Sequence, residues 1–243
     1  MDINEWEIWY TKILDDFGFS REGDEKTADI LNNILDKKGC LNIDDLYDYV
    51  LEKTLSNNYI VFGAGPSLKS NIIKIKNDYD LNNYILIAAD GATTALLEED
   101  IIPDIIVSDL DGKISDLLIA NSQKIVFAVH AHGDNEDKIK TYTNILNNVF
   151  GTTQSIPEGN LYNFGGFTDG DRAIFLAVEL GAEKILLAGM DFGTKVTKYS
   201  RPNIKEDIED ADEIKQKKLK YAEELTNWIK NNEDAELVNL TFS

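Results

Sequence analysis

The sequence predicts an α/β fold in which a mostly parallel, Rossmann-like sheet is covered by helices on both faces. Two observations support this expectation. Short apolar runs of strand length alternate with segments of helical periodicity along most of the 243 residues. Each apolar run ends in Gly, Asp, His or Ser, and ligands of open α/β sheets bind beyond these carboxyl ends. The ends of these strands are therefore expected to form one rim that carries the chemistry.

Residues 1–56 are expected to form a small N-terminal helical cap. Apolar residues recur there at helical spacing, as in Trp6, Trp9 and Ile13, and Asn42 is a natural N-cap for a later helix. No motif of chemical interest lies in this segment. We expect it to pack on the main domain, with a lid or an oligomer contact as the alternative.

Residues 57–243 are expected to form one Rossmann-like domain. Helical patterns at 92–99 and 172–180 separate its apolar runs. The segment 204–232 is charged and helical in pattern, with one apolar stripe and a mixed Glu/Lys face that is typical of a solvated surface. A final strand is expected at 237–242. The other predicted strands are 59–62, 84–88, 105–107, 124–129 and 184–188.

The composition limits the classes of partner. The formal net charge of −20 disfavours binding to bare nucleic acid or to an anionic membrane surface. Cys40 is the single cysteine, which excludes an internal disulfide and a zinc ribbon. No apolar run approaches the length of a membrane span, and the acidic N-terminus lacks the pattern of a signal peptide. We therefore expect a cytoplasmic protein; its oligomeric state is left open.

Two aspartates, Asp109 and Asp111, follow the apolar run 105–107 and precede a glycine. In a near-extended backbone this spacing directs both carboxylates to the same side. Two crowded carboxylates favour a cation, and a small set of hard oxygen ligands suits Mg²⁺ that shares its shell with substrate phosphates. The alternative is a turn in which the aspartates cap backbone N–H groups.

A glycine-rich loop with Gly63, Gly65, Pro66 and Ser67 lies between a predicted strand and a predicted helix. Such a loop can present N–H groups and a helix N-terminus to phosphate, although a plain tight turn is the alternative. A dinucleotide site would use Asp90, after the next strand, as the ribose ligand. That interpretation lacks the third glycine and leaves the other acidic residues without a role.

Both histidines of the chain, His130 and His132, lie at one strand end beside Asp134. Their spacing allows both rings on one side. Zinc would lack a clear third ligand. We expect one histidine to contact a phosphate or a substrate hydroxyl, and Asp134 to complete a metal shell or to support one.

The segment 165–173 combines two glycines, Thr168, Asp169 and Arg172 at the start of a predicted helix. Thr168 or Asp169 is a natural N-cap, which accounts for part of the pattern. Arg172 is expected to clamp a phosphate. Asp191, in a similar Gly-Met-Asp-Phe-Gly segment, is either a strand-end cap or a ligand to the N–H groups of a heterocycle.

Taken in order, these motifs resemble the archaeal 6-hydroxymethyl-7,8-dihydropterin pyrophosphokinase family over about residues 60–195. The motifs are Gly-Ala-Gly-Pro-Ser-Leu, Ala-Asp-Gly-Ala, Pro-Asp-Ile-Ile-Val-Ser-Asp-Leu-Asp-Gly, His-Ala-His-Gly-Asp, Gly-Phe-Thr-Asp-Gly-Asp-Arg-Ala and Gly-Met-Asp-Phe-Gly. The Ser-Asp-Leu-Asp-Gly element is also similar to the metal-binding aspartates of thiamine pyrophosphokinase. Related domains occur in flagellin-glycosylation accessory proteins.

The resemblance implies a kinase that transfers diphosphate from ATP to the hydroxymethyl group of the reduced pterin, releases AMP and serves pterin-cofactor biosynthesis such as that of tetrahydromethanopterin. Residues 57–243 would be its catalytic domain, with Mg²⁺ as cofactor. The implied roles are as follows: catalysis by Asp109, Asp111 and His132; metal binding by Asp109, Asp111 and Asp134; phosphate or nucleotide binding by Gly63, Gly65, Pro66, Ser67, Asp90 and Arg172; substrate binding by Asp169, Asp171 and Asp191.

Two alternatives remain open from the sequence. One is a nucleotide-sugar-binding or glycosyl-transferring domain like the flagellin accessory proteins, and the other is a thiamine-type pyrophosphokinase. A nucleotide-binding regulator would differ from all of these because it would keep its function after Asp111→Asn.

Overall fold

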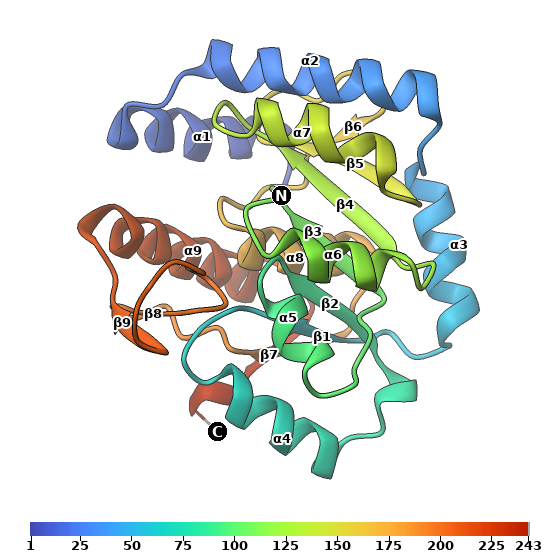
Figure 1. The fold of residues 1–243 in the computed structure, drawn as a ribbon, viewed down its shortest axis with the longest axis vertical. Helices are drawn as coiled ribbons and strands as arrows, with labels where there is room; N and C mark the ends of the chain where they lie inside the picture. The colour runs from blue at the N-terminus through green and yellow to red at the C-terminus, as the bar shows by residue number, and fades with distance from the viewer. Residues whose placement is uncertain (243) are drawn as a thin grey trace.

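The computed structural model describes residues 1–242, which contain one eight-stranded parallel sheet with helices on both faces (Figure 1). This confirms the predicted α/β class. The strand order is β10-β7-β1-β2-β3-β4-β5-β6, and a separate two-stranded antiparallel hairpin pairs β8 with β9. The strands are β1 (Asn58–Phe62), β2 (Ile85–Ala89), β3 (Ile105–Ser108), β4 (Val126–Ala131), β5 (Val149–Thr153), β6 (Leu161–Tyr162), β7 (Lys184–Ala188), β8 (Lys195–Thr197), β9 (Ile208–Asp210) and β10 (Glu236–Asn239).

Helices connect most of these strands along the chain. The α-helices are α1 (Ile3–Phe17), α2 (Arg21–Lys38), α3 (Ile43–Lys53), α4 (Leu68–Asp78), α5 (Ala92–Leu97), α6 (Ile114–Asn121), α7 (Glu136–Tyr142), α8 (Asp169–Glu179) and α9 (Glu213–Asn232). Short 3₁₀ turns cover η1 (Leu81–Asn83), η2 (Thr143–Ile145) and η3 (Leu240–Phe242). Among residues 1–242, no helix is both long and apolar enough to span a bilayer.

The strand order reverses at β1, which lies between β2 and β7. From β1 the chain first builds the sheet outward to β6, and α8 then carries it back to β7 on the other side. Loops diverge at such a reversal, so a crevice opens at the carboxyl ends of the two strands. The loops that follow β1 and β7 are the glycine-rich segments with Gly65 and Asp191.

Two apolar cores lie on the two faces of the sheet, because successive strand residues point to opposite sides. Tyr59 and Val61 of β1 belong to the core under α1, α3, α8 and α9. Ile60 and Phe62 belong to the core under α2 and α4 to α7. The strands are almost wholly buried, as expected for a parallel sheet that is covered on both faces.

The N-terminal helices contribute to both cores. Trp6 and Tyr10 of α1 are buried on one face, and Leu31 and Leu35 of α2 are buried on the other. The expected division of the chain at residues 56 and 57 stays a prediction. Because α1 and α2 bury residues in different cores, the N-terminal helices pack on both faces of the sheet.

Two sequence expectations about secondary structure need correction. The final strand ends at Asn239, and residues 240–242 form a 3₁₀ turn instead of continuing it. The charged helix begins only at Glu213, because Asp212 caps it by accepting a hydrogen bond from Lys215 N at 2.7 Å. The residues before it form β9 of the hairpin.

Candidate active site

A cavity of about 990 Å³ opens at the carboxyl ends of the strands. One side consists of the loops after β1, β2, β3, β4 and β7 and the start of α8. The other side consists of the α1–α2 turn, the segment around the β8–β9 hairpin and the start of α9. These last three parts lie together on the left of Figure 1, although they are far apart in the sequence.

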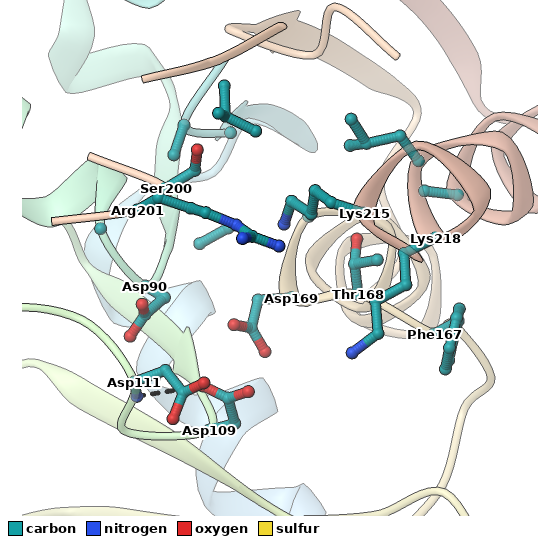
Figure 2. A pocket seen from close by; sticks show the side chains of 18 of the residues that line it. Asp90, Asp109, Asp111, Phe167, Thr168, Asp169, Ser200, Arg201, Lys215 and Lys218 are labelled. Carbon is teal, nitrogen blue, oxygen red and sulfur yellow. Dashed lines mark hydrogen bonds between the residues drawn. The ribbon is translucent and has the colours of Figure 1, made fainter. Parts of the chain in front are cut away.

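Three aspartates meet in this cavity: Asp90 after β2, Asp109 after β3 and Asp169 at the start of α8 (Figure 2). One carboxylate oxygen from each lies within 4.8 Å of those of the other two. Neighbouring parallel strands bring the first two together, and Thr168, as the N-cap of α8, places the third above them. Sequence reasoning assigned Asp90 to a nucleotide and Asp169 to the substrate, and did not predict this grouping.

Hydrogen bonds fix two of the three carboxylates. Ser108 Oγ donates to Asp90 Oδ1 at 2.5 Å, and His132 Nε2 lies 3.2 Å from Asp109 Oδ2. Asp169 Oδ1 is buried and has no hydrogen-bond partner among residues 1–242. Its nearest charged partner is Arg172, whose Nη1 lies 3.7 Å away.

The electrostatics of the cluster show mutual repulsion. Burial and the charge of Asp109 raise the pKa of Asp90 to about 7. Burial and the charges of Asp109 and Asp90 raise the pKa of Asp169 well above its usual range. Burial alone would also raise the pKa of Asp109, but the hydrogen bond and charge of His132 and the charge of Arg172 outweigh it and lower this pKa.

The three carboxylates fit a divalent cation. They offer only hard oxygen ligands, which suit Mg²⁺, Mn²⁺ or Ca²⁺ rather than a thiophilic metal. A bound cation would relieve the repulsion that raises the pKa values of Asp90 and Asp169.

Asp111 lies at the edge of this cluster. Leu110, between Asp109 and Asp111, has a φ of 67° and a buried side chain, so the backbone is not extended and the spacing does not align the two carboxylates as expected. The Asp111 side chain is 60% exposed, against 19% for Asp109. It forms an ion pair with Lys138, and its backbone N–H donates to Asp109 Oδ1 at 3.0 Å.

His132 supports Asp109. The backbone N–H of Asp134 donates to His132 Nδ1 at 3.3 Å, and because an N–H can only donate, the ring hydrogen belongs on Nε2. His132 Nε2 then donates to Asp109 Oδ2. The side chain of Asp134 is exposed at the cavity rim, outside the three-carboxylate cluster. His130 is buried beneath, with its Nδ1 3.1 Å from Thr152 Oγ1, and burial lowers its pKa.

The glycine-rich loop is bound to the loop after β7. The N–H groups of Gly63 and Gly65 donate to the carbonyl oxygens of Ala188 and Gly189, at 2.8 and 2.9 Å. The Ser67 hydroxyl donates to Asp191 Oδ2 at 3.0 Å, and the Ser67 N–H also donates to that carboxylate. A Cβ on Gly65 would collide with the Asp191 carboxylate, which accounts for the glycine. These predicted phosphate donors are therefore engaged within the chain, and Pro66 lies in the same turn.

Asp171 and Arg172 have different environments. Asp171 is fully buried and accepts hydrogen bonds from Phe167 N, Thr168 N and Thr168 Oγ1, so it caps α8 from outside the cavity lining. Arg172 lines the cavity, and its Nη2 donates to Gln154 Oε1 at 2.8 Å. Its Nη1 lies 3.7 Å from Asp169 Oδ1.

Three cations enter the cavity from the side opposite Asp109: Arg201, Lys215 and Lys218 (Figure 2). Sequence reasoning placed Lys215 and Lys218 in the solvated segment 204–232 and assigned no role to Arg201. Burial lowers the pKa of Lys215, while the charges of Asp169 and Asp109 act in the opposite direction. The sequence contained a signal for the two lysines. Ala222 and Leu225 lie on the buried face of α9, and residues three or four positions apart share a helix face. Counting back from them toward the helix start at these spacings reaches Lys218 and Lys215.

The site thus belongs to an α/β protein whose rim cavity sets a carboxylate cluster against cations, an arrangement compatible with a phosphorylated ligand and a divalent metal. The chain belongs to the family described as 6-hydroxymethylpterin diphosphokinase MptE-like, whose profile matches residues 28–197.

Relatives of known name agree with this family. The chain is 52% identical to the 6-hydroxymethyl-7,8-dihydropterin pyrophosphokinase of Methanothermobacter thermautotrophicus, over 98% of this chain and 99% of the relative. It is 50% identical to the protein of the same name from Methanocaldococcus jannaschii, over 98% and 100%, and 45% identical to that from Pyrococcus furiosus, over the full length of both.

Among solved structures, the MAf glycosyltransferase from Magnetospirillum magneticum AMB-1 aligns with a TM-score of 0.49 and 15% identity. The alignment covers 78% of this chain, and the chain spans about a third (34%) of that much longer protein.

Proposed function

We propose that this protein transfers diphosphate from ATP to the hydroxymethyl group of 6-hydroxymethyl-7,8-dihydropterin and releases AMP, in a reaction that depends on Mg²⁺. Family membership and the names of three near-full-length relatives support the substrate and the reaction. The observation that carries the proposal is the cavity itself, in which three carboxylates face three cations across a space at the carboxyl ends of the strands.

Asp90, Asp109 and Asp169 would hold the metal. When bound, a divalent cation neutralises charge on the phosphates and supports the loose transition state of phosphoryl-type transfer. His132 orients Asp109 through the Nε2 hydrogen bond, so its part in this proposal is to position a metal ligand.

Lys215, Lys218 and Arg201 would bind the triphosphate from the opposite wall. Phosphoryl-type transfer needs positioning and charge neutralisation more than covalent help, and ammonium and guanidinium groups supply both. Arg201 also pairs with Asp212, the N-cap of α9, at 2.6 Å, which ties the segment after β8 to the start of α9.

The reaction itself is a single in-line displacement. The hydroxymethyl oxygen attacks the β-phosphorus of ATP, the new O–P bond forms, and the bond from that phosphorus to the α-phosphate oxygen breaks. The β- and γ-phosphoryl groups move together to the acceptor, AMP leaves with the bridging oxygen, and the proton of the hydroxyl passes to solvent water.

The test uses purified protein, ATP, Mg²⁺ and 6-hydroxymethyl-7,8-dihydropterin, with separate detection of AMP and ADP. We expect AMP and the pterin diphosphate in equal amounts, and neither when EDTA removes the metal. Thiamine and nucleotide sugars serve as competing substrates. Release of ADP, or turnover with a competing substrate and none with the pterin, would contradict the proposal.

A further inference from the structure

The cavity has two chemically different ends. Along the rim the strands follow the order β7, β1, β2, β3, β4 and β5, so the acid cluster after β2 and β3 lies between the two ends. Neighbouring strands are about 5 Å apart. The two ends of the rim are therefore far enough apart for one to hold the nucleotide and the other to hold the second substrate. The β7–β1 end is the reversal point of the sheet, where nucleotides bind in folds of this type.

The β4–β5 end is lined by aromatic rings. Phe19, in the turn between α1 and α2, and Phe167, just before α8, both line the cavity. Their ring centroids lie 6.4 Å apart at an angle of 48°. Phe17 packs against both, with centroids at 5.2 Å from each, and it does not line the cavity. The three rings thus form one aromatic cluster, and Phe17 is the member that does not reach the cavity.

A flexible side chain covers these rings on the cavity side. The Lys218 ammonium lies 5.4 Å from the Phe19 centroid and 5.6 Å from the Phe167 centroid. A lysine over a ring face can move aside without movement of the backbone. In the view of Figure 2, Lys218 is drawn between Phe167 and Asp169, and like them it lines the cavity.

The buried residues beneath this end of the cavity are polar and form a hydrogen-bonded network. Asp24 of α2 is buried and accepts hydrogen bonds from Tyr10 Oη, Gln154 Nε2 and Gly133 N, at 2.6, 2.7 and 2.7 Å. Gln154 in turn accepts from Arg172. The Arg172 Nε–H and Asp169 Oδ1 remain without hydrogen-bond partners among residues 1–242 although both are buried. The Arg172 Nε–H is thus a donor without a protein partner at this end of the cavity, whereas Asp169 is assigned to the metal and lies 3.7 Å from Arg172 Nη1.

We propose that the α1–α2 turn and Phe167 form the subsite for the acceptor heterocycle, with Phe19 as a residue that determines acceptor affinity. A flat ring with a carbonyl group suits two aromatic faces near one free donor, the Arg172 Nε–H. Phe19 and Lys218 both lie outside the stretch that matches the family profile, residues 28–197. The identity of the heterocycle as a pterin rests on the proposed function; the aromatic subsite does not.

The test is calorimetric titration of the full-length protein with oxidised 6-hydroxymethylpterin, in the presence of Mg²⁺ and a non-hydrolysable ATP analogue. Phe19→Leu removes the aromatic face, and we expect about tenfold weaker heterocycle binding, in line with the usual strength of ring stacking. Binding of the ATP analogue should change less than about twofold, because its end of the cavity lies three strands away.

Phe17→Leu is the matched control, since it removes a neighbouring ring that does not line the cavity. It should lower thermal stability without weakening heterocycle binding. Phe19→Trp keeps an aromatic face and should restore binding, which separates a subsite role from a packing role and replaces Phe19→Leu if that variant is unstable. Equal pterin affinity in the wild type and Phe19→Leu, or equal losses in both Leu variants, would overturn the subsite.

The same titrations separate this inference from the proposed function. A wild-type protein that binds another flat heterocycle, weakened by Phe19→Leu, would support the subsite while contradicting the pterin. A wild-type protein that makes AMP from ATP and the pterin, with Phe19→Leu unchanged in both pterin affinity and KM, would support the function while refuting the subsite. Absence of heterocycle binding in the wild type would refute the subsite.

Discussion

The two walls of the cavity are built in opposite ways. The acidic wall, Asp90, Asp109 and Asp169, stands at strand ends and at a helix start whose positions follow from the register of the central sheet. The cationic wall, Arg201, Lys215 and Lys218, stands on the segment after β8 and on the first turns of α9, outside the sheet.

The difference shows how one site combines carboxylates in fixed positions with cations on longer side chains. Carboxylates that share a metal need fixed mutual positions, and buried parallel strands supply them. Cations that bind phosphates during entry, transfer and release benefit from long side chains on a peripheral element. If this comparison is right, changes in the acidic wall should affect the chemical step most strongly, and changes in the cationic wall should affect nucleotide binding.

The largest effect is expected for Asp109→Asn. Loss of one charged ligand at the metal should lower kcat by about 10²- to 10³-fold, measured as AMP formation with saturating ATP and acceptor. The matched control is Asp111→Asn, two residues away, which is exposed and paired with Lys138. That variant should lose less than about tenfold, whereas the sequence alone predicts that it removes most turnover. Equal losses would show that Asp111 binds the metal as strongly as Asp109.

Lys215→Met should have the next largest effect. Removing one charge-assisted contact to the phosphates costs about 1.5–3 kcal/mol, which corresponds to about a ten- to hundredfold rise in the KM for ATP. Lys220→Met on the same helix is the control, because Lys220 is 75% exposed and pairs only distantly with Glu224. A Lys215→Met enzyme with unchanged KM and kcat would remove the cationic wall from the mechanism.

Asp169 and Asp171, two residues apart, should separate function from stability. Asp171→Ala removes the acceptor of three hydrogen bonds and should lower the free energy of unfolding by about 3 kcal/mol in urea titrations. Asp169→Asn removes a buried, repelled charge and should lower kcat, by no more than Asp109→Asn does, without lowering stability in metal-free buffer. The reverse pattern would contradict the assignment of Asp169 to the metal.

The smallest effect concerns the metal alone. Mg²⁺ at about a hundred times its Kd should stabilise the wild type by about 2.7 kcal/mol, visible as an increase in Tm of several degrees. Asp109→Asn should lose most of this increase, while Lys215→Met should retain it, because only the acidic wall holds the cation. An equal metal response in all three proteins would place the cation elsewhere.

Much of the site could be predicted because polar residues at the ends of apolar runs mark the rim of a parallel sheet. Asp90, Asp109, His132 and Asp191 all lie there. What the pattern could not show is which of them converge. Leu110 has a left-handed backbone and a buried side chain, so the segment is not extended, and the Asp111 side chain is 60% exposed against 19% for Asp109.

Residues that act across the cavity were beyond sequence reasoning. Asp24 and Phe19 belong to a segment without recognisable motifs. They line the cavity because α1 and α2 pack beside the loops that follow β4 and β5. Lys215 and Lys218 lie on a helix with a charged composition, where most lysines are solvated. Only the packing of α9 against α8 directs these two inward.

The sequence by itself determined the layered α/β architecture, the rim and its acidic character, because these follow from local periodicity and from the residues at strand ends. The tertiary structure alone decided which carboxylates share a space, which donors are already engaged by the chain, and which cations face them. These contacts join residues that are distant in the sequence, so they depend on strand order, backbone conformation and helix packing at the same time.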